Sequence, residues 1–131
     1  KALLRVRKID KKTILTYKKQ IHNDLGVKQH TEYETEVSDV DSIENIIRVL
    51  GFKLGMVYEK RRQTWHLQNV EVCLDQLPFG LFMEVEGKIS EIGLIEMLLE
   101  LEDFEVENNT YPKLTYHLGI EKDGVIEARF T

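Results

Sequence analysis

Alternation of apolar and charged residues recurs in stretch after stretch of this chain, and it constrains the fold more than any other feature. In "GLFMEVEG", Leu81, Met83 and Val85 would lie on one face of a strand, with Glu84 and Glu86 on the other. Similar alternation runs through "ALLRVRKI", "TILTYKK", "HTEYETEV", "GMVYEKRRQTW" and "VEVCLDQ". So many one-sided strands predict an antiparallel sheet that buries one of its faces.

Two stretches change from the strand period to the helical period. In "DSIENIIRVLG" the apolar residues recur at i, i+3, i+4 and i+7, which predicts an amphipathic helix with Asp41 as its N-cap. In "EIGLIEMLLELEDF" a second helix is predicted, capped by Ser90. Its apolar stripe is expected to consist of Leu94, Leu98 and Leu101. Near the end of the chain, Asp123-Gly124 predicts a tight turn between two short strands. The chain is therefore predicted to be an α+β protein.

Length, charge and cysteine content exclude several classes of protein. The chain of 131 residues fits a single domain spanning 1–131. A net charge of −5 argues against a general nucleic-acid or anionic-membrane binder. A single cysteine, Cys73, forms no internal disulfide, and we expect a cytoplasmic location. The sequence has no signal-peptide pattern and no apolar run long enough to span a membrane.

Charged side chains of both signs occupy the polar faces of the predicted strands. They are Arg5, Arg7, Lys18, Glu32, Glu34, Glu36, Lys60, Arg62, Glu71, Asp75, Glu84 and Glu86. Pairs of like charge two residues apart repel each other on one face of a strand, which favours a ligand over a merely solvated surface. Arginine and lysine bind phosphate oxygens, and carboxylates bind Mg²⁺ or Mn²⁺. The pattern predicts a sheet closed around a polyanion and a divalent cation.

The order and spacing of these motifs resemble the CYTH domain, the superfamily of class IV adenylate cyclases and thiamine triphosphatases. The resemblance is carried by "LLRVR", "TYK", "EYETEV", "EKRRQTW", "VCLDQLPFGLFMEVEG" and "TYPKL", over about residues 3–114. It implies an antiparallel, eight-stranded β-barrel tunnel, here complete or incomplete, with helices packed outside. It also implies that the tunnel binds a triphosphate together with Mg²⁺ or Mn²⁺.

The resemblance assigns roles to individual residues. The residues that it implies for phosphate binding are Arg5, Arg7, Lys18, Lys60 and Arg62. It implies Glu84 and Glu86 as metal ligands. The acidic residues that it implies for catalysis are Glu34, Glu36 and Asp75. Thr110 and Tyr111 resemble the terminal Ser-Tyr of the family.

One departure concerns the N-terminal "ExExK" of the family, which is absent ahead of Lys1. We expect that this strand is missing from the chain. The tail "GVIEARF", with Glu127 and Arg129, resembles half of that motif, and it is interpreted either as an ordinary terminal hairpin or, less readily, as an edge strand substituting for it.

Three functions remain open. The first is an enzyme, a metal-dependent hydrolase of inorganic or organic triphosphate. The second is a class IV adenylate cyclase that converts ATP to cyclic AMP and pyrophosphate. The third is a non-catalytic module that binds triphosphate or polyphosphate. The expected partner is a small molecule, namely inorganic triphosphate, ATP or thiamine triphosphate, with a homodimer left open.

Overall fold

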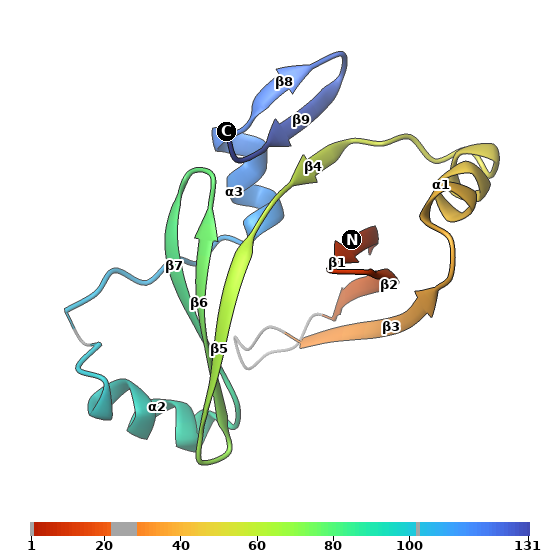
Figure 1. Ribbon diagram of the computed structural model, residues 1–131. Coiled ribbons are helices and arrows are strands. Elements are labelled where there is room, and N and C mark those ends of the chain that lie inside the picture. The colour runs from red at the N-terminus through yellow and green to blue at the C-terminus, as the bar shows by residue number, and fades with distance from the viewer. Residues whose placement is uncertain (1, 22–28, 102) are drawn as a thin grey trace. The chain divides into compact units, whose positions relative to one another are not determined.

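The computed structural model describes residues 2–21, 29–101 and 103–131, which form two compact units, 1–53 and 54–131 (Figure 1). The first unit contains β1 (Ala2–Ile9), β2 (Lys12–Ile21), β3 (Gln29–Val37) and α1 (Val40–Val49). The second contains β4 (Met56–Tyr58), β5 (Arg61–Leu67), β6 (Val70–Leu77), β7 (Gly80–Glu86), α2 (Ile89–Leu98), α3 (Tyr111–Leu118), β8 (Ile120–Lys122) and β9 (Val125–Ala128).

The first unit is built on an antiparallel sheet with the order β1-β2-β3. The turn between β1 and β2 falls at Asp10, whose φ of 52° places it in the left-handed region that tight turns use. The pairing aligns Arg5 with Thr16, and Thr16 with Glu34. Because paired residues in a sheet point to the same side, this register confirms the predicted division of each strand into two faces.

The N-cap of helix α1 lies two residues earlier than predicted. Its N-cap is Asp39, whose carboxylate accepts a hydrogen bond from the backbone N–H of Asp41 at 3.2 Å. The predicted N-cap, Asp41, instead lies in the first helical turn, where its negative charge still suits the helix N-terminus. Gly51, with a φ of 100°, follows the helix and provides the left-handed residue that ends it.

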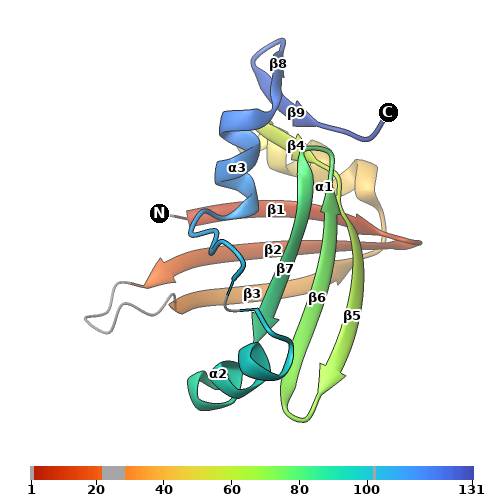
Figure 2. The ribbon, with the colours of Figure 1, turned by 90° about the vertical axis from the view of Figure 1, so that its left-hand side faces the viewer.

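The second unit contains an antiparallel sheet with the order β5-β6-β7, whose strands lie side by side in Figure 2. Helix α2 packs Ile95 against Val70 and Val72 on the apolar face of this sheet. The predicted stripe is wrong in part, because Leu94 and Leu98 are 47% and 62% exposed. The predicted cap is also wrong, because the helix begins after Lys88, which makes no side-chain capping bond.

A second sheet in this unit has the order β4-β9-β8. β8 and β9 form the predicted antiparallel hairpin, with Asp123 and Gly124 at φ values of 52° and 81° in the turn. β9 also pairs with β4 in parallel, so the tail strand is central in this sheet and is more than a terminal hairpin. Helix α3, which the strand pattern did not predict, contacts β4 and β9. A Cβ atom on Gly119 would lie 2.7 Å from the side chain of Ile126, so this close approach requires glycine.

The predicted α+β class is confirmed, but the described strands do not close into a barrel. They form three separate three-stranded sheets, and the β4-β9 pairing is parallel where an antiparallel sheet was expected. The separate pairing of β4 follows from a break in the stretch that the alternation treats as one strand. Glu59 donates its backbone N–H to the carbonyl oxygen of Ala128 at 3.0 Å, and the sheet of β5 starts only at Arg61.

Among the described residues, no helix is long and apolar enough to cross a membrane.

Candidate functional site

The polar face of the β5-β6-β7 sheet brings together residues from all three strands. Its register forms two neighbouring rows, Arg62 with Asp75 and Phe82, then Thr64 with Cys73 and Glu84. A third row contains His66, Glu71 and Glu86. The sheet therefore places Arg62, Asp75, Glu84 and Glu86 on one face, as the alternation predicted.

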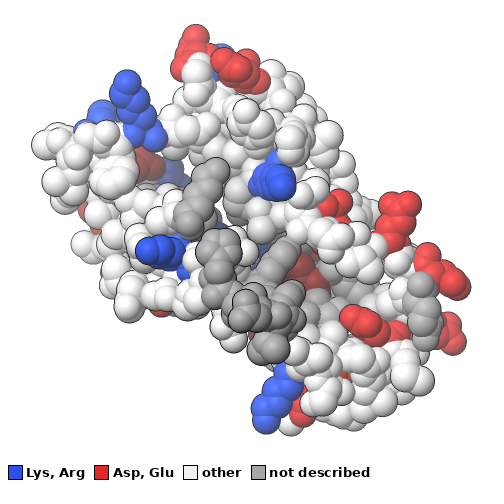
Figure 3. Space-filling model, turned by 180° about the vertical axis from the view of Figure 1, so that it is seen from behind, with Lys and Arg blue, Asp and Glu red and all other residues white. Residues whose placement is uncertain are grey.

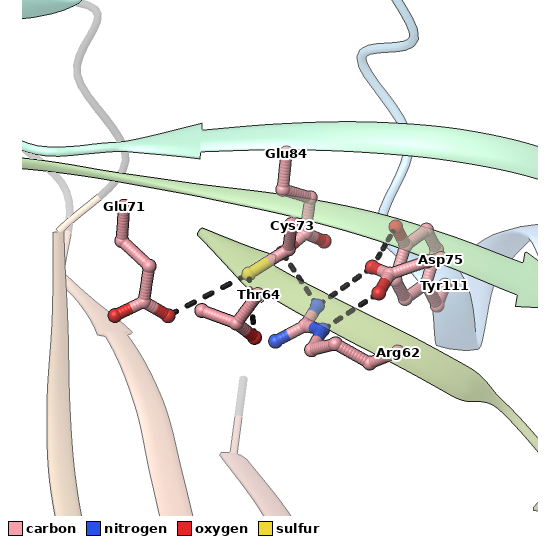
Figure 4. A network of polar contacts seen from close by, with 7 residues as sticks. All are labelled: Arg62, Thr64, Glu71, Cys73, Asp75, Glu84 and Tyr111. Atoms are coloured by element: carbon pink, nitrogen blue, oxygen red, sulfur yellow. Dashed lines mark hydrogen bonds and ion pairs between the residues drawn. The ribbon is translucent and has the colours of Figure 1, made fainter. Parts of the chain in front are cut away.

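Arg62 is held by two carboxylates (Figure 4). Its Nε donates to Oδ1 of Asp75 at 2.6 Å, and its Nη2 donates to Oδ2 of Asp75 at 2.7 Å. The same Nη2 donates to Oε2 of Glu84 at 2.9 Å. The side chain of Asp75 is completely inaccessible, whereas that of Glu84 is 35% exposed. Because both N–H groups of one edge engage Asp75, the plane of the guanidinium is fixed by a bidentate pair.

Tyr111, the first residue of α3, completes this network from outside the sheet. Its Oη donates to Oδ2 of Asp75 at 2.5 Å. Its ring packs edge-on against Phe82, with centroids 5.5 Å apart, and the Nζ of Lys60 lies 5.3 Å from its centroid. Lys60 lies just before β5 and not in a strand. Of the two predicted cations, Lys60 thus contacts Tyr111 directly, and Arg62 is connected to it through Asp75.

The electrostatics of the network follow from its burial. Burial alone would raise the pKa of Asp75, but hydrogen bonds from Arg62 and Tyr111 outweigh it and hold this pKa below its usual range. Burial and the hydrogen bond to Asp75 raise the pKa of Tyr111 well above its usual value. The hydrogen bonds to Asp75 likewise raise the pKa of Arg62. At neutral pH the network contains anionic Asp75, cationic Arg62 and a neutral tyrosine.

Cys73 lies on the same polar face, as predicted, and is fully buried there. Its Sγ donates to Oε1 of Glu71 at 3.5 Å and lies 3.7 Å from Oγ1 of Thr64. Burial raises the pKa of this thiol, which favours the neutral form and not a nucleophilic thiolate. Cys73 therefore serves as a small polar residue that fills the space between Arg62 and Glu71.

The predicted residues of the first unit also share one face of their own sheet. The register forms three rows, Leu3 with Lys18 and Glu32, Arg5 with Thr16 and Glu34, and Arg7 with Ile14 and Glu36. Thr16 is buried and donates its Oγ1 to Oε2 of Glu34 at 3.2 Å. The Nε of Arg5 is buried and has no hydrogen-bond partner among the described residues. This sheet therefore presents an arginine with an unused donor.

Glu84 and Glu86 are the residues that the resemblance implies as ligands of a divalent cation. They lie two residues apart on the same face of β7, and Glu71 of β6 lies opposite Glu86 on that face. Carboxylate oxygens are the hard ligands that Mg²⁺ and Mn²⁺ prefer, so the donor chemistry fits the implied metal. Among the described residues, no group of three or more His, Cys, Asp or Glu is arranged as a metal site. One oxygen of Glu84 is engaged by Arg62.

The tail residues Glu127 and Arg129 bond to each other. The Nε and Nη2 of Arg129 donate to the Glu127 carboxylate at 3.2 and 3.4 Å. The backbone N–H of Phe130 donates to Glu59 at 2.8 Å, and Arg61 lies over the Phe130 ring. Arg61 is on the face of β5 opposite Arg62. Because β9 is central and Glu127 is already paired with Arg129, the structure gives no support to an edge strand that substitutes for "ExExK".

Sequence reasoning missed the part of the network that depends on α3. Thr110 caps this helix by accepting from the N–H of Lys113 at 3.4 Å, and Pro112 lies in its first turn. A threonine cap followed by an early proline is a helix-start signal that could have predicted α3. The contact between Tyr111 and Asp75 joins residues 36 positions apart, and no local pattern could have predicted it.

Comparison with known proteins identifies the family. The model of the CYTH domain matches residues 1–111, and the chain belongs to this family. A protein of Methanocaldococcus jannaschii named "Putative adenylate cyclase MJ0240" is 29% identical over 128 residues, which cover 97% of this chain and 67% of that protein.

Two solved structures share the fold. The PH1012 protein of Pyrococcus horikoshii OT3 matches with a TM-score of 0.73 and 31% identity, over 86% of this chain and 74% of that one. A conserved hypothetical protein of Pyrococcus furiosus matches with a TM-score of 0.74 and 24% identity, over the same shares of the two chains.

Proposed function

We propose that this protein is a metal-dependent hydrolase of a triphosphate, most simply inorganic triphosphate. Membership of the CYTH domain family supports a substrate that contains a triphosphate. The observation that carries the proposal is the fixed guanidinium of Arg62, with Lys60 nearby. Two cations beside a carboxylate-lined face suit a phosphate chain, and Glu84 and Glu86 on that face would hold a metal that neutralises further phosphate charge.

Arg62 retains donors for a phosphate. Its contacts with Asp75 and Glu84 use Nε and Nη2, and the two N–H groups of Nη1 have no acceptor among the described residues. In the proposed complex, Nη1 donates to a phosphate oxygen while Asp75 keeps the guanidinium plane in place. Arg5, Arg7 and Lys18 are proposed to supply further cations. The unused Nε of Arg5 supports this role.

Glu84 and Glu86 are proposed to hold Mg²⁺ or Mn²⁺. When bound, such an ion neutralises charge on the phosphate oxygens and orients the nucleophile. Glu34 and Glu36 remain proposed catalytic residues that position the attacking water. The carboxylate of Asp75 is buried and accepts hydrogen bonds from Arg62 and Tyr111. We therefore propose that Asp75 orients Arg62 and does not contact the substrate.

A second function, adenylate cyclase, is favoured by the name of the Methanocaldococcus jannaschii relative. In that reaction the ribose 3′ oxygen of ATP would replace water as the nucleophile, and pyrophosphate would leave. Both reactions require the same grip on the phosphates. The phosphate-binding residues therefore do not distinguish them.

One experiment separates these functions. The protein is incubated with ATP or with inorganic triphosphate, with and without Mg²⁺ or Mn²⁺, and the products are resolved by ion-exchange chromatography. Metal-dependent release of phosphate from inorganic triphosphate is expected. Cyclic AMP with pyrophosphate would identify the cyclase. Calorimetric binding of triphosphate without turnover would identify a binding module, and neither binding nor turnover would overturn the proposal.

A further inference from the structure

Tyr111 is linked to both cations of the Lys60–Arg62 pair, to Lys60 by direct contact and to Arg62 through Asp75. Its hydroxyl donates to Oδ2 of Asp75 at 2.5 Å, and Asp75 binds Arg62 through both carboxylate oxygens. The face of its ring lies 5.3 Å from the Nζ of Lys60, within the range of a cation–π contact. One side chain therefore touches one cation directly and reaches the other through a buried carboxylate.

The Tyr111 ring is itself held in place by groups other than these cations. Its backbone carbonyl accepts a hydrogen bond from Oγ1 of Thr115 at 2.8 Å. The ring packs against Phe82 at an interplanar angle of 61°, and it belongs to a buried cluster with Leu77 and Leu114. Only 9% of the residue is exposed. A rigid, buried ring can serve as a template for more flexible side chains.

We propose that Tyr111 is a positioning residue for both phosphate-binding cations, with its hydroxyl acting on Arg62 through Asp75 and its ring acting directly on Lys60. The inference rests on the proposed function, in which these two cations bind phosphate. It also assigns Asp75 to positioning, because its described side-chain hydrogen bonds are with Arg62 and Tyr111. The phosphate site would thus depend on α3, which neither supplies a cation to it nor belongs to its sheet.

The physical benefit is a lower entropic cost of binding. Arginine and lysine have long stems with many rotamers, and ordering them on binding a ligand reduces affinity. Loss of the Tyr111 hydroxyl would leave Oδ2 of Asp75 with Arg62 as its hydrogen-bond donor and would remove the bond that anchors the Arg62–Asp75 pair to α3. Loss of the ring would remove the surface on which the Lys60 ammonium rests.

The two links can be broken separately. Tyr111→Phe removes the hydroxyl and keeps the ring, whereas Tyr111→Leu removes both. Affinity for inorganic triphosphate is measured by calorimetry in the unsubstituted protein and in the Lys60→Ala and Arg62→Gln backgrounds. We expect Tyr111→Phe to weaken binding about tenfold, as loss of one hydrogen bond to a charged group does. Tyr116→Phe, on the exposed side of the same helix, is the matched control and should bind normally.

The backgrounds distinguish positioning from a general effect on the fold. The loss of triphosphate affinity caused by Tyr111→Phe should be the same in the Lys60→Ala background as in the unsubstituted protein. It should disappear in the Arg62→Gln background. In the unsubstituted background, Tyr111→Leu should lower the affinity for triphosphate more than Tyr111→Phe does. In the Lys60→Ala background, the two variants should have the same affinity. If Tyr111→Phe bound normally while Arg62→Gln bound weakly, the inference would be wrong and the proposed function would stand. A loss of equal size in every background would indicate a structural role only and would also overturn the inference.

A measurement without ligand checks the same geometry. The Nε–H resonance of Arg62, observed by ¹⁵N NMR, should exchange slowly with solvent in the unsubstituted protein because it donates to buried Asp75. It should exchange faster in Tyr111→Phe and remain slow in Tyr116→Phe. Unchanged exchange in Tyr111→Phe would contradict the inference. Failure of the unsubstituted protein to bind triphosphate would overturn the proposed function, and with it the part of the inference that concerns phosphate.

Discussion

The polar faces of the β1-β2-β3 and β5-β6-β7 sheets contain the same residue types but differ in how their charges are paired. On β5-β6-β7, Arg62 makes three hydrogen bonds to carboxylates, and Asp75 is fully buried. On β1-β2-β3, Glu34 accepts from a neutral threonine, and the buried Nε of Arg5 has no described acceptor. One face pairs its arginine, Arg62, with carboxylates, whereas the other presents an unused donor on Arg5.

This difference teaches how such a site can be both stable and receptive. A buried arginine–carboxylate pair keeps its geometry without ligand, because removing either partner leaves an unpaired charge. An unpaired arginine costs stability in the free protein but gains a new partner when an anion binds. Acidic side chains also gather elsewhere in the second unit, over α2 and the segment that follows it (Figure 3). Among the described residues there, no carboxylate is paired with an arginine or a lysine. Abundance of charge alone therefore does not define a site.

The largest expected effect concerns the metal. Glu84→Gln and Glu86→Gln should each lower metal-dependent turnover about a hundredfold or more, because each removes an anionic oxygen ligand at nearly constant shape. Turnover of inorganic triphosphate at saturating Mg²⁺ measures this. Circular dichroism should stay unchanged, and Glu96→Gln on α2 is a matched control. Normal rates in both variants would remove these residues from the metal site.

The next prediction tests whether the two faces differ in stability. Asp75→Ala should lower the free energy of unfolding by about 3 kcal/mol, because it removes a fully buried carboxylate and leaves Arg62, whose side chain is 28% exposed, with one carboxylate partner. Glu34→Ala removes a hydrogen bond to a neutral donor at an exposed residue and should cost about 1 kcal/mol or less. Urea denaturation measures both. Equal losses would show that the two faces do not differ as argued.

Arg62→Lys keeps the charge and removes the planar fork. It should lower kcat/KM about ten- to a hundredfold, because a charge-assisted bond worth about 1.5–3 kcal/mol is lost. Arg61→Ala, on the opposite face of the same strand, should retain most of the activity. A greater loss for Arg61→Ala than for Arg62→Lys would mean that the functional face has been assigned one residue out of register.

The smallest expected effect is a pH dependence of stability. The pKa of Asp75 is lowered from 3.8 in the folded protein, so its stabilising contribution is complete above about pH 5 and is lost as the pH falls below 3.8. The difference in unfolding free energy between the unsubstituted protein and Asp75→Asn should therefore shrink only in acid. The pKa of Tyr111 is raised from 10.0, so its contribution is complete at neutral pH and is lost only above pH 10. A difference that changed between pH 6 and pH 8 would contradict both assignments.

Prediction from sequence succeeded where a period or a local turn determines the outcome. The face of Arg62, Asp75 and Glu84 follows from alternation alone, and the Asp123-Gly124 hairpin follows from turn chemistry. Prediction was less accurate where two local signals compete. At α1, both Asp39 and Asp41 are residues that can cap a helix, and the structure has Asp39 as the N-cap. Prediction failed at α2, where Ile95 and not the leucine stripe is buried, because the sheet decides which helical face it covers.

The sequence by itself determined which residues share a strand face and which charges are available for a phosphate and a metal, because the side-chain period of a strand is a local property of the backbone. The tertiary structure alone decided that β4 leaves the line of β5 to pair with β9, and that Tyr111 reaches Asp75. Both depend on contacts between residues far apart in the chain. These contacts form when α3 packs its Tyr111 and Leu114 against Leu77 and Phe82. Local patterns carry no information about such contacts, because the free energy that selects them arises only when the distant segments bury each other.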